Sequence, residues 1–174
     1  VLSGEGSDEA SGSYLYFHNA PDSQSFQNEC IRLLQDVQYF DVLRGDKTTA
    51  GAGLEIRVPF FDKTFMEYYM SISPDKKMVR DNMEKYLLRK AFINDLPDDV
   101  VWRRKDGFSD GVSSFEKPWY QIVEEYAQKN YNMNESEMYK HIYNKYYNGV
   151  ENIPYMWMPK WSDSKDPSNR SINI

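Results

Sequence analysis

Hydrophobic residues recur at helical spacing along most of the chain, and this pattern predicts a mostly α-helical protein. The clearest run begins at Phe26 and extends to about Leu43. Its apolar positions, three or four residues apart, are Phe26, Cys30, Leu33, Leu34, Val37 and Phe40. Shorter helices are expected over residues 8–18 and 62–71, the second capped at its start by Asp62.

Three further helices follow in the second half of the sequence. Asp81 with Glu84 three residues later predicts a reciprocal capping pair at the start of a helix over residues 82–92. Another amphipathic helix is expected around residues 119–127, with Pro118 near its first turn. Asn134 with Glu137 marks the last helix, and we expect its stripe of apolar and aromatic residues to be core. The stripe comprises Met138, Tyr139, Ile142, Tyr143, Tyr146 and Tyr147.

The start of the chain departs from this helical pattern. Val1 and Leu2 are typical of the end of a buried strand, and a Gly-containing loop and a helix start follow them. A strand, such a loop and many helices fit the latter half of an α/β domain. Because the sequence opens inside a strand rather than with Met, we expect it to be a fragment of a longer protein.

Composition excludes several classes of protein. The net charge of -6 disfavours nucleic-acid binding, which usually needs a basic face. The single cysteine, Cys30, excludes an internal disulfide framework, and its helical position favours a core residue over a catalytic thiol. No apolar run is long enough for a membrane span and no signal peptide is recognisable, so a cytoplasmic protein is expected. His18 and His141 lack partners at metal-ligand spacing.

The loop Ser3-Gly4-Glu5-Gly6-Ser7-Asp8-Glu9 carries the first candidate chemistry. Its glycines allow positive φ and close approach of another molecule, and Ser7 or Asp8 can cap the helix that follows. A loop before a helix start suits a phosphate, but the three acids would repel it unless Mg²⁺ lies between them. The loop therefore indicates Mg-nucleotide or pyrophosphate chemistry, with a solvated turn as the equally weighted alternative.

Two other stretches combine charge with glycine. Residues 44–62 contain three glycines, and Glu55 and Arg57 stand there among apolar residues. A buried ion pair is favoured for them over direct catalysis. Residues 102–111 include Lys105 in a basic run before a Gly-containing loop. Such a cation could stabilise developing negative charge, although a solvated charge run is the commoner explanation.

Taken in order, these motifs resemble glutamine-hydrolysing asparagine synthetases, in the C-terminal part of the synthetase domain. The resemblance covers almost the whole chain. Besides the opening loop, it includes Tyr14 to His18, Gly53 to Phe60, Glu84-Lys85 and Leu88-Arg89, Trp102-Arg103 with Lys105, Phe108 to Val112, Trp157 to Trp161 and Asp166 to Ser168. Each motif is moderately specific, and the ordered set is highly specific.

The resemblance implies an α/β fold. Residues 1–174 would be the mostly helical C-terminal part of an adenine nucleotide α-hydrolase-like domain of the PP-loop ATP pyrophosphatase type. The glutaminase domain with its Cys nucleophile, the first pyrophosphate motif (S-G-G-x-D-S) and the main aspartate-recognition segment precede Val1 in the family. A homodimer of the full-length protein is also compatible with the resemblance.

The implied reaction forms β-aspartyl-AMP from aspartate and ATP and then aminates it with ammonia from glutamine. Ser3, Gly4, Glu5 and Gly6 would bind ATP and the adenylate. Glu5 would be the general base and Asp8 would hold Mg²⁺. Lys105 would be the second catalytic residue, stabilising negative charge, and Glu55 would lie near the ammonia path. No membrane or nucleic-acid partner is implied.

Two departures from the family pattern are visible. Ala10-Ser11-Gly12-Ser13 replaces a larger apolar residue and a Gly-Gly or Gln-Gly pair, and Ala52 replaces a usual Trp or His. These changes could loosen the packing behind the loop or alter the ammonia route. The alternatives are a β-lactam synthetase-like ligase, which Glu5 disfavours because that family uses a Tyr–Glu pair, and a non-catalytic nucleotide-binding or partner-binding remnant. A plain helical interaction protein would leave the opening loop unexplained.

Overall fold

The computed structural model describes residues 1–107, 117, 119–148, 154, 155 and 157–163. These residues belong to two compact units. The first comprises Val1–Arg104 together with Pro159–Asp163, and the second begins at Lys105 and contains the last two helices. The predicted motif over residues 108–112, Pro118 and the motif over residues 166–168 lie outside the described residues.

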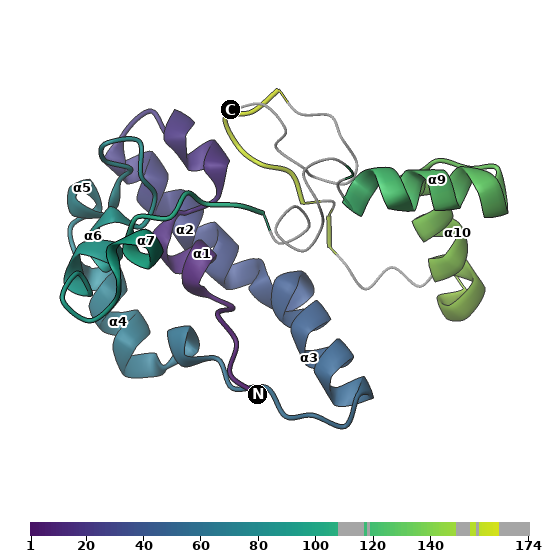
Figure 1. Ribbon diagram of the computed structural model, residues 1–174, viewed down its shortest axis with the longest axis horizontal. Coiled ribbons are helices and arrows are strands. Elements are labelled where there is room, and N and C mark those ends of the chain that lie inside the picture. Colours follow the sequence, from purple (N-terminus) through teal and green to yellow (C-terminus); the bar gives the residue numbers. More distant parts are fainter. Residues whose placement is uncertain (108–116, 118, 149–153, 156, 164–174) are drawn as a thin grey trace. The chain divides into compact units, whose positions relative to one another are not determined.

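Helices dominate the first unit (Figure 1). In chain order they are α1 (Ser7–Ser11), the 3-10 helix η1 (Leu15–Asn19), α2 (Ser23–Asp36), η2 (Val37–Tyr39), α3 (Asp41–Gly51), η3 (Pro59–Phe61), α4 (Lys63–Ser71), α5 (Pro74–Lys77), α6 (Tyr86–Ala91) and α7 (Asp98–Val101). The central helix is α2, which packs against both α1 and α5. No helix in the described part of the chain is both long and apolar enough to cross a membrane.

The long apolar run from Phe26 forms two helices rather than one. α2 begins after Asp22, whose Oδ1 accepts a hydrogen bond from the Ser25 amide at 2.7 Å. Phe40 then leaves the helical region, with φ −121° and ψ −107°, and α3 begins at the next residue. The prediction of a single helix was wrong because no Gly or Pro marks this break and periodicity alone does not report a backbone turn.

The predicted helix over residues 8–18 is also interrupted. α1 ends at Ser11 because Gly12 adopts the left-handed conformation, with φ 59° and ψ 50°. A Cβ atom on Gly12 would lie 2.3 Å from Cζ of Phe26 and 2.8 Å from Cδ1 of Phe17. Ser11 and Ser13 on either side are also buried. The backbone at Gly12 is therefore closely packed against Phe17 and Phe26.

The opening segment pairs with residues far along the chain. Leu2 forms a parallel bridge with Arg57: the Arg57 amide donates to the Val1 carbonyl at 2.7 Å, and the Ser3 amide donates to the Arg57 carbonyl at 2.9 Å. Parallel pairing requires a crossover connection, here through α1, α2 and α3. The pairing fits an α/β arrangement, but the predicted burial was wrong, because Leu2 is 77% exposed. The ATP pyrophosphatase type of fold stays a prediction.

The predicted capping pair at Asp81 and Glu84 is wrong. Asp81 and Asn82 have positive φ angles of 51° and 58°, and α6 does not begin until Tyr86. The Glu84 side chain is buried and contacts Nε2 of His18 at 2.5 Å. A long-range hydrogen bond with His18 therefore uses the carboxylate that the cap would have needed.

Residues 159–163 return to the first unit. Lys160 Nζ lies 2.9 Å from Oε2 of the fully buried Glu29, and the Tyr16 hydroxyl donates to Oε1 of the same carboxylate at 2.8 Å. Burial opposes ionisation of Glu29, but hydrogen bonds from Arg32, Lys160 and Tyr16 lower its pKa below the ordinary value. Trp161 adds ring contacts with Tyr16, so this segment is fixed to α2 and η1 by charge and by packing.

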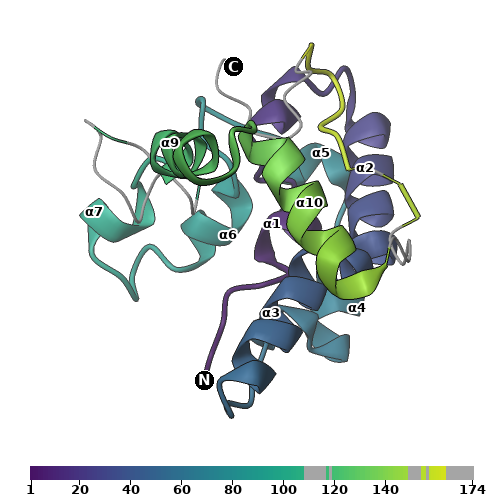
Figure 2. The ribbon, with the colours of Figure 1, turned by 90° about the vertical axis from the view of Figure 1, so that its right-hand side faces the viewer.

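The second unit contains α9 (Trp119–Tyr131) and α10 (Glu135–Tyr147), which pack against each other (Figure 2). The predicted capping pair is confirmed: Asn134 Oδ1 accepts from the Glu137 amide at 2.9 Å and Glu137 Oε2 accepts from the Asn134 amide at 3.1 Å. The predicted core stripe of α10 is only partly correct. Met138 is buried, whereas Tyr146 is 70% exposed.

We expect Gly12→Ala to destabilise the first unit by roughly 2–4 kcal/mol, because the new methyl group adds overpacking to an unfavourable positive φ. Gly51→Ala is the matched control: Gly51 lies at the end of α3, and a Cβ there has no neighbour within 4 Å. The control should be neutral or slightly stabilising. Urea unfolding of the two variants measures the difference, and equal stabilities would contradict the packing described around Gly12.

Candidate functional site

The loop from Ser3 to Ser7 joins the paired opening segment to α1. Gly6 is the N-cap of α1 and has φ 90°, and a Cβ there would lie 2.7 Å from the Phe61 ring. Backbone conformation and Phe61 together therefore require glycine at this position. Gly4 has open space where a Cβ would stand, which is what close approach of a ligand needs.

The local helix start differs from the expected one. Neither Ser7 nor Asp8 caps α1, since Gly6 occupies the N-cap position without a side-chain hydrogen bond. α1 is only five residues long, so its dipole is small. Positive charge for an anion at this loop must therefore come mainly from side chains.

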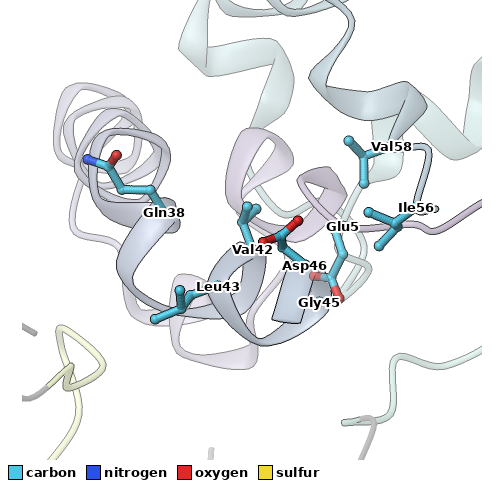
Figure 3. A pocket seen from close by; sticks show the side chains of 8 residues that line it. All are labelled: Glu5, Gln38, Val42, Leu43, Gly45, Asp46, Ile56 and Val58. Atoms are coloured by element: carbon cyan, nitrogen blue, oxygen red, sulfur yellow. The ribbon is translucent and has the colours of Figure 1, made fainter. Parts of the chain in front are cut away.

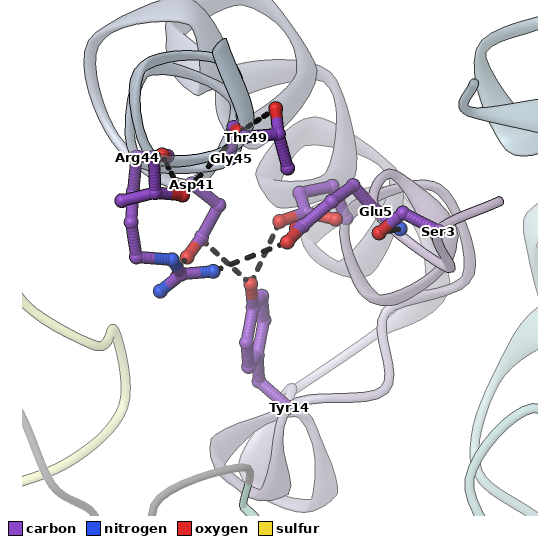
Figure 4. Close-up of polar contacts among 9 residues, drawn as sticks. Ser3, Glu5, Tyr14, Asp41, Arg44, Gly45 and Thr49 are labelled. Carbon is purple, nitrogen blue, oxygen red and sulfur yellow. Dashed lines mark hydrogen bonds and ion pairs between the residues drawn. The ribbon is translucent and has the colours of Figure 1, made fainter. Parts of the chain in front are cut away.

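Glu5 projects from the loop toward α3. Its Oε1 lies 3.2 Å from Nη2 of Arg44, whose Nη1 lies 2.9 Å from Oδ1 of Asp41. One guanidinium therefore links two carboxylates (Figure 4). Partial burial opposes the charge on Arg44, but Asp41 and Glu5 raise its pKa above the ordinary value, so it stays cationic.

Glu5 also borders a pocket of about 200 Å³ (Figure 3). The lining side chains come from the loop, from η2 and α3, and from the extended segment before η3. They are Glu5, Gln38, Val42, Leu43, Gly45, Asp46, Ile56 and Val58. The pocket is mainly apolar, so Glu5 stands where a small neutral molecule could meet a carboxylate.

Asp8 lies on the other side of the loop, in a group of polar contacts. Its Oδ1 is 2.5 Å from Lys85 Nζ and accepts a hydrogen bond from the Ser13 hydroxyl. Lys85 also donates to the Ser7 hydroxyl at 2.8 Å. This arrangement joins the loop to residues 83–86 and places an ammonium group beside the loop.

The same contacts test whether Asp8 fits Mg²⁺. The described residues contain no group of three or more His, Cys, Asp or Glu side chains that could hold a metal. However, Mg²⁺ is commonly held by one or two carboxylates together with phosphate oxygens and water. Asp8 offers one such carboxylate, and its Oδ1 is engaged by Lys85 and Ser13.

Beneath the loop, Glu9 is buried and faces Tyr14. The Tyr14 hydroxyl lies 2.7 Å from Glu9 Oε1 and 3.2 Å from Asp41 Oδ2. Burial raises the pKa of Glu9 to about 7, and the charges of Asp41 and Asp8 act in the same direction. Burial and the carboxylates of Glu9 and Asp41 raise the pKa of Tyr14, which keeps its proton.

Glu55 and Lys105 are the two other predicted site residues. Glu55 is ion-paired with Arg57 at 2.9 Å, but both side chains are largely exposed, so the expected burial of this pair was wrong. Its neighbour Ile56, rather than Glu55, lines the pocket. Lys105 is the first residue of the second unit and is not among the side chains described around Glu5.

Sequence reasoning missed three residues of the site. Arg44 was included only in a glycine-containing stretch, and Lys85 and Tyr14 only as parts of motifs. Asp41 and Arg44 are three residues apart, which is a recognisable pairing distance on a helix. No comparable local signal links Lys85 to Asp8, since 77 positions separate them.

Comparison with known proteins places the chain in a family. The asparagine synthase family model matches residues 19–162. The chain belongs to the asparagine synthase family. Among curated proteins it is 41% identical to asparagine synthetase (glutamine-hydrolyzing) of Gallus gallus, 40% to that of Mus musculus and 38% to that of Homo sapiens, over 99% of the chain in each case.

The chain spans about a third of the length of these relatives, 34% in each. Their name describes enzymes that synthesise asparagine and hydrolyse glutamine, which makes them ligases. The resemblance found in the motifs is thereby confirmed for the family. In the described first unit, Glu5 contacts Arg44 and also lines the pocket.

We expect Glu9→Gln to change how stability depends on pH. An unfolded glutamate ionises near pH 4.5, whereas native Glu9 holds its proton to about pH 7. The native state therefore binds more protons between these values, and the contribution of Glu9 to stability falls as pH rises from about 4.5 to 7. The loss is on the order of 3 kcal/mol, at 1.36 kcal/mol per unit of pKa.

Urea unfolding at pH 5 and pH 8 measures this effect. Glutamine does not ionise, so Glu9→Gln should lose less stability between the two pH values than the unsubstituted chain. Glu67→Gln is a matched control, because the Glu67 side chain is 70% exposed in α4. Identical pH dependence of all three proteins would contradict the ionisation assigned to Glu9.

Proposed function

We propose that this chain is part of an ATP-dependent amide ligase that converts aspartate to asparagine. Membership of the asparagine synthase family supports the proposal. The observation that carries it is the Glu5 carboxylate, held by Arg44 at 3.2 Å and facing a mainly apolar pocket. A carboxylate in that setting suits a general base for a small neutral nucleophile.

The proposed reaction has two steps. An oxygen of the aspartate side-chain carboxylate attacks the α-phosphorus of ATP, and pyrophosphate leaves to give β-aspartyl-AMP. Ammonia, derived from glutamine in a separate glutaminase domain, then attacks the β-carbonyl carbon. One proton passes from the attacking nitrogen to Glu5, the C–O bond to AMP breaks, and asparagine and AMP are released.

Each predicted site residue has a separate role in this reaction. Ser3, Gly4, Glu5 and Gly6 line the adenylate, and the open space at Gly4 lets a ligand reach the backbone. Asp8 would hold Mg²⁺, which supplies positive charge to the phosphate groups. Lys105 would stabilise negative charge on the phosphate or on the tetrahedral intermediate.

The pocket beside Glu5 fits the ammonia step. Its volume of about 200 Å³ exceeds the needs of ammonia, and its lining is mainly apolar apart from Glu5, Gln38 and Asp46. Ile56 lines the pocket and follows Glu55 in the sequence. The proposed ammonia path would therefore run along this segment. Glu55 itself would act near the entrance, because its side chain is exposed.

The test uses a fusion enzyme in which the complete 174-residue chain replaces the matching segment of the Gallus gallus relative. It should form asparagine from aspartate, ATP and ammonia. Glu5→Gln should lower asparagine formation by roughly 10²–10⁴-fold, the usual contribution of a general base. Aspartate-dependent exchange of pyrophosphate into ATP should persist, because adenylation precedes the proton transfer.

Glu67→Gln is the control, since it makes the same chemical change on an exposed helix position. Full asparagine formation by the Glu5→Gln fusion would rule out Glu5 as the base. A fusion that binds ATP but shows neither exchange nor asparagine formation would favour a non-catalytic nucleotide-binding remnant. ATP-dependent closure of a β-lactam ring in place of amination would instead favour a β-lactam synthetase-like ligase.

A further inference from the structure

Gly45 is a glycine that the backbone of the first unit does not require. It lies in the interior of α3 and keeps the helical conformation, whereas Gly6 and Gly12 have positive φ angles, which favour glycine. A glycine in a helix interior is unfavourable compared with alanine, because it loses more conformational freedom on folding. Backbone conformation therefore does not explain the glycine at position 45.

Lack of space does not explain it either. A Cβ atom at position 45 would lie 3.5 Å from Cδ1 of Ile56 and 3.8 Å from Oε1 of Glu5, which are ordinary van der Waals contacts. At Gly6 and Gly12, by contrast, the nearest atom of an aromatic ring would lie within 3 Å of the added Cβ. Alanine would therefore fit at position 45, and its methyl group would fill space that is open beside the Glu5 carboxylate.

This open space belongs to the pocket that Glu5 lines. Gly45 is part of the pocket wall together with Glu5 and Ile56 (Figure 3). The other polar side chains of the wall are Gln38 and Asp46, and the Asp46 side chain is 55% exposed. The absence of a side chain at position 45 thus enlarges the pocket directly beside its carboxylate.

The pocket is larger than ammonia needs. A water molecule takes up about 30 Å³ in the liquid, and ammonia is of similar size. The pocket has a volume of about 200 Å³. The difference leaves room for an alkyl group of about two or three carbon atoms on the nitrogen. The mainly apolar wall suits such a group, since burial of each methylene group from water favours binding.

We propose that the Glu5 pocket also accepts short primary alkylamines, such as methylamine and ethylamine, and that Gly45 sets the size of the nucleophile. The inference rests on the role of Glu5 given under Proposed function. The nitrogen contacts Glu5, and the first carbon lies in the space that an alanine methyl group at position 45 would fill. The rest of the alkyl group lies against the apolar part of the wall.

The reaction is the amide-forming step with one hydrogen of ammonia replaced by an alkyl group. The lone pair of the amine nitrogen forms a C–N bond to the β-carbonyl carbon of β-aspartyl-AMP. One of the two N–H protons passes to Glu5, and the C–O bond to AMP breaks with its electron pair on the phosphate oxygen. The products are AMP and asparagine alkylated on its side-chain amide nitrogen, without any oxidation or reduction.

The test supplies the fusion enzyme with aspartate, ATP and either ammonia, methylamine or ethylamine, with rates expressed per unprotonated amine. Mass spectrometry should detect N-alkylasparagine with both alkylamines. The ratio kcat/KM should be roughly fourfold higher for ethylamine than for methylamine, the gain from burying one methylene group. Trimethylamine is the negative control, because it has no N–H proton to pass to Glu5 and should give no amide.

Gly45→Ala tests the size limit. Its methyl group takes the space of the first alkyl carbon, so kcat/KM for ethylamine relative to that for ammonia should fall roughly 10–200-fold, the usual effect of one methyl group in an apolar pocket. Gly51→Ala is the matched control, because it makes the same change in α3 where a Cβ has no neighbour within 4 Å, and it should leave the ratio unchanged. Aspartate-dependent pyrophosphate exchange shows that each variant has folded.

The outcomes separate this inference from the proposed function. Asparagine from ammonia without N-alkylasparagine from either alkylamine would overturn the inference alone, and so would an equal loss with ammonia and ethylamine in Gly45→Ala. Undiminished N-alkylasparagine formation by Glu5→Gln would also overturn it, provided that the same variant has lost asparagine formation, because the alkylamine would then react outside the pocket. No asparagine from ammonia in the unsubstituted fusion would overturn the proposed function and the inference together.

Discussion

The first unit depends on supplying partners to buried carboxylates. An ionised acid out of water is strongly unfavourable unless hydrogen bonds or opposite charge compensate it. Glu29 meets this requirement with Tyr16, Arg32 and Lys160, and Glu84 meets it with His18. These partners come from distant parts of the sequence, so compensation of charge fixes the relative positions of α2, η1, residues 83–86 and residues 159–163.

Local patterns predicted the helices better than their ends. Asp22 was not predicted as a cap, although the helix beginning after it was found, and Asn134 with Glu137 was predicted correctly because both partners lie in one turn. The equally good local pattern at Asp81 and Glu84 was wrong. His18 binds Glu84 from 66 positions away, and such a contact leaves no trace in a short window of sequence.

In the candidate site, too, the sequence predicted residues with a local pattern and missed those defined by long-range contacts. Glu5 and Asp8 could be identified because acids beside glycines are unusual and because the motifs resemble a family. The partners of these acids, Arg44 and Lys85, follow from the folding of α3 and residues 83–86 against the loop. Gly6 shows both sides of this, since its predicted positive φ is confirmed, whereas the Phe61 ring that also requires a glycine there was not predicted.

Charge around the loop limits how a nucleotide can bind. Three acidic side chains near the loop, Glu5, Asp8 and Asp41, contact two basic ones, Arg44 and Lys85. The five-residue α1 adds little positive potential of its own. Polyphosphate would meet net repulsion at such a site. Binding of ATP therefore requires added positive charge, which is why Mg²⁺ at Asp8 and a cation such as Lys105 belong together in the proposed reaction.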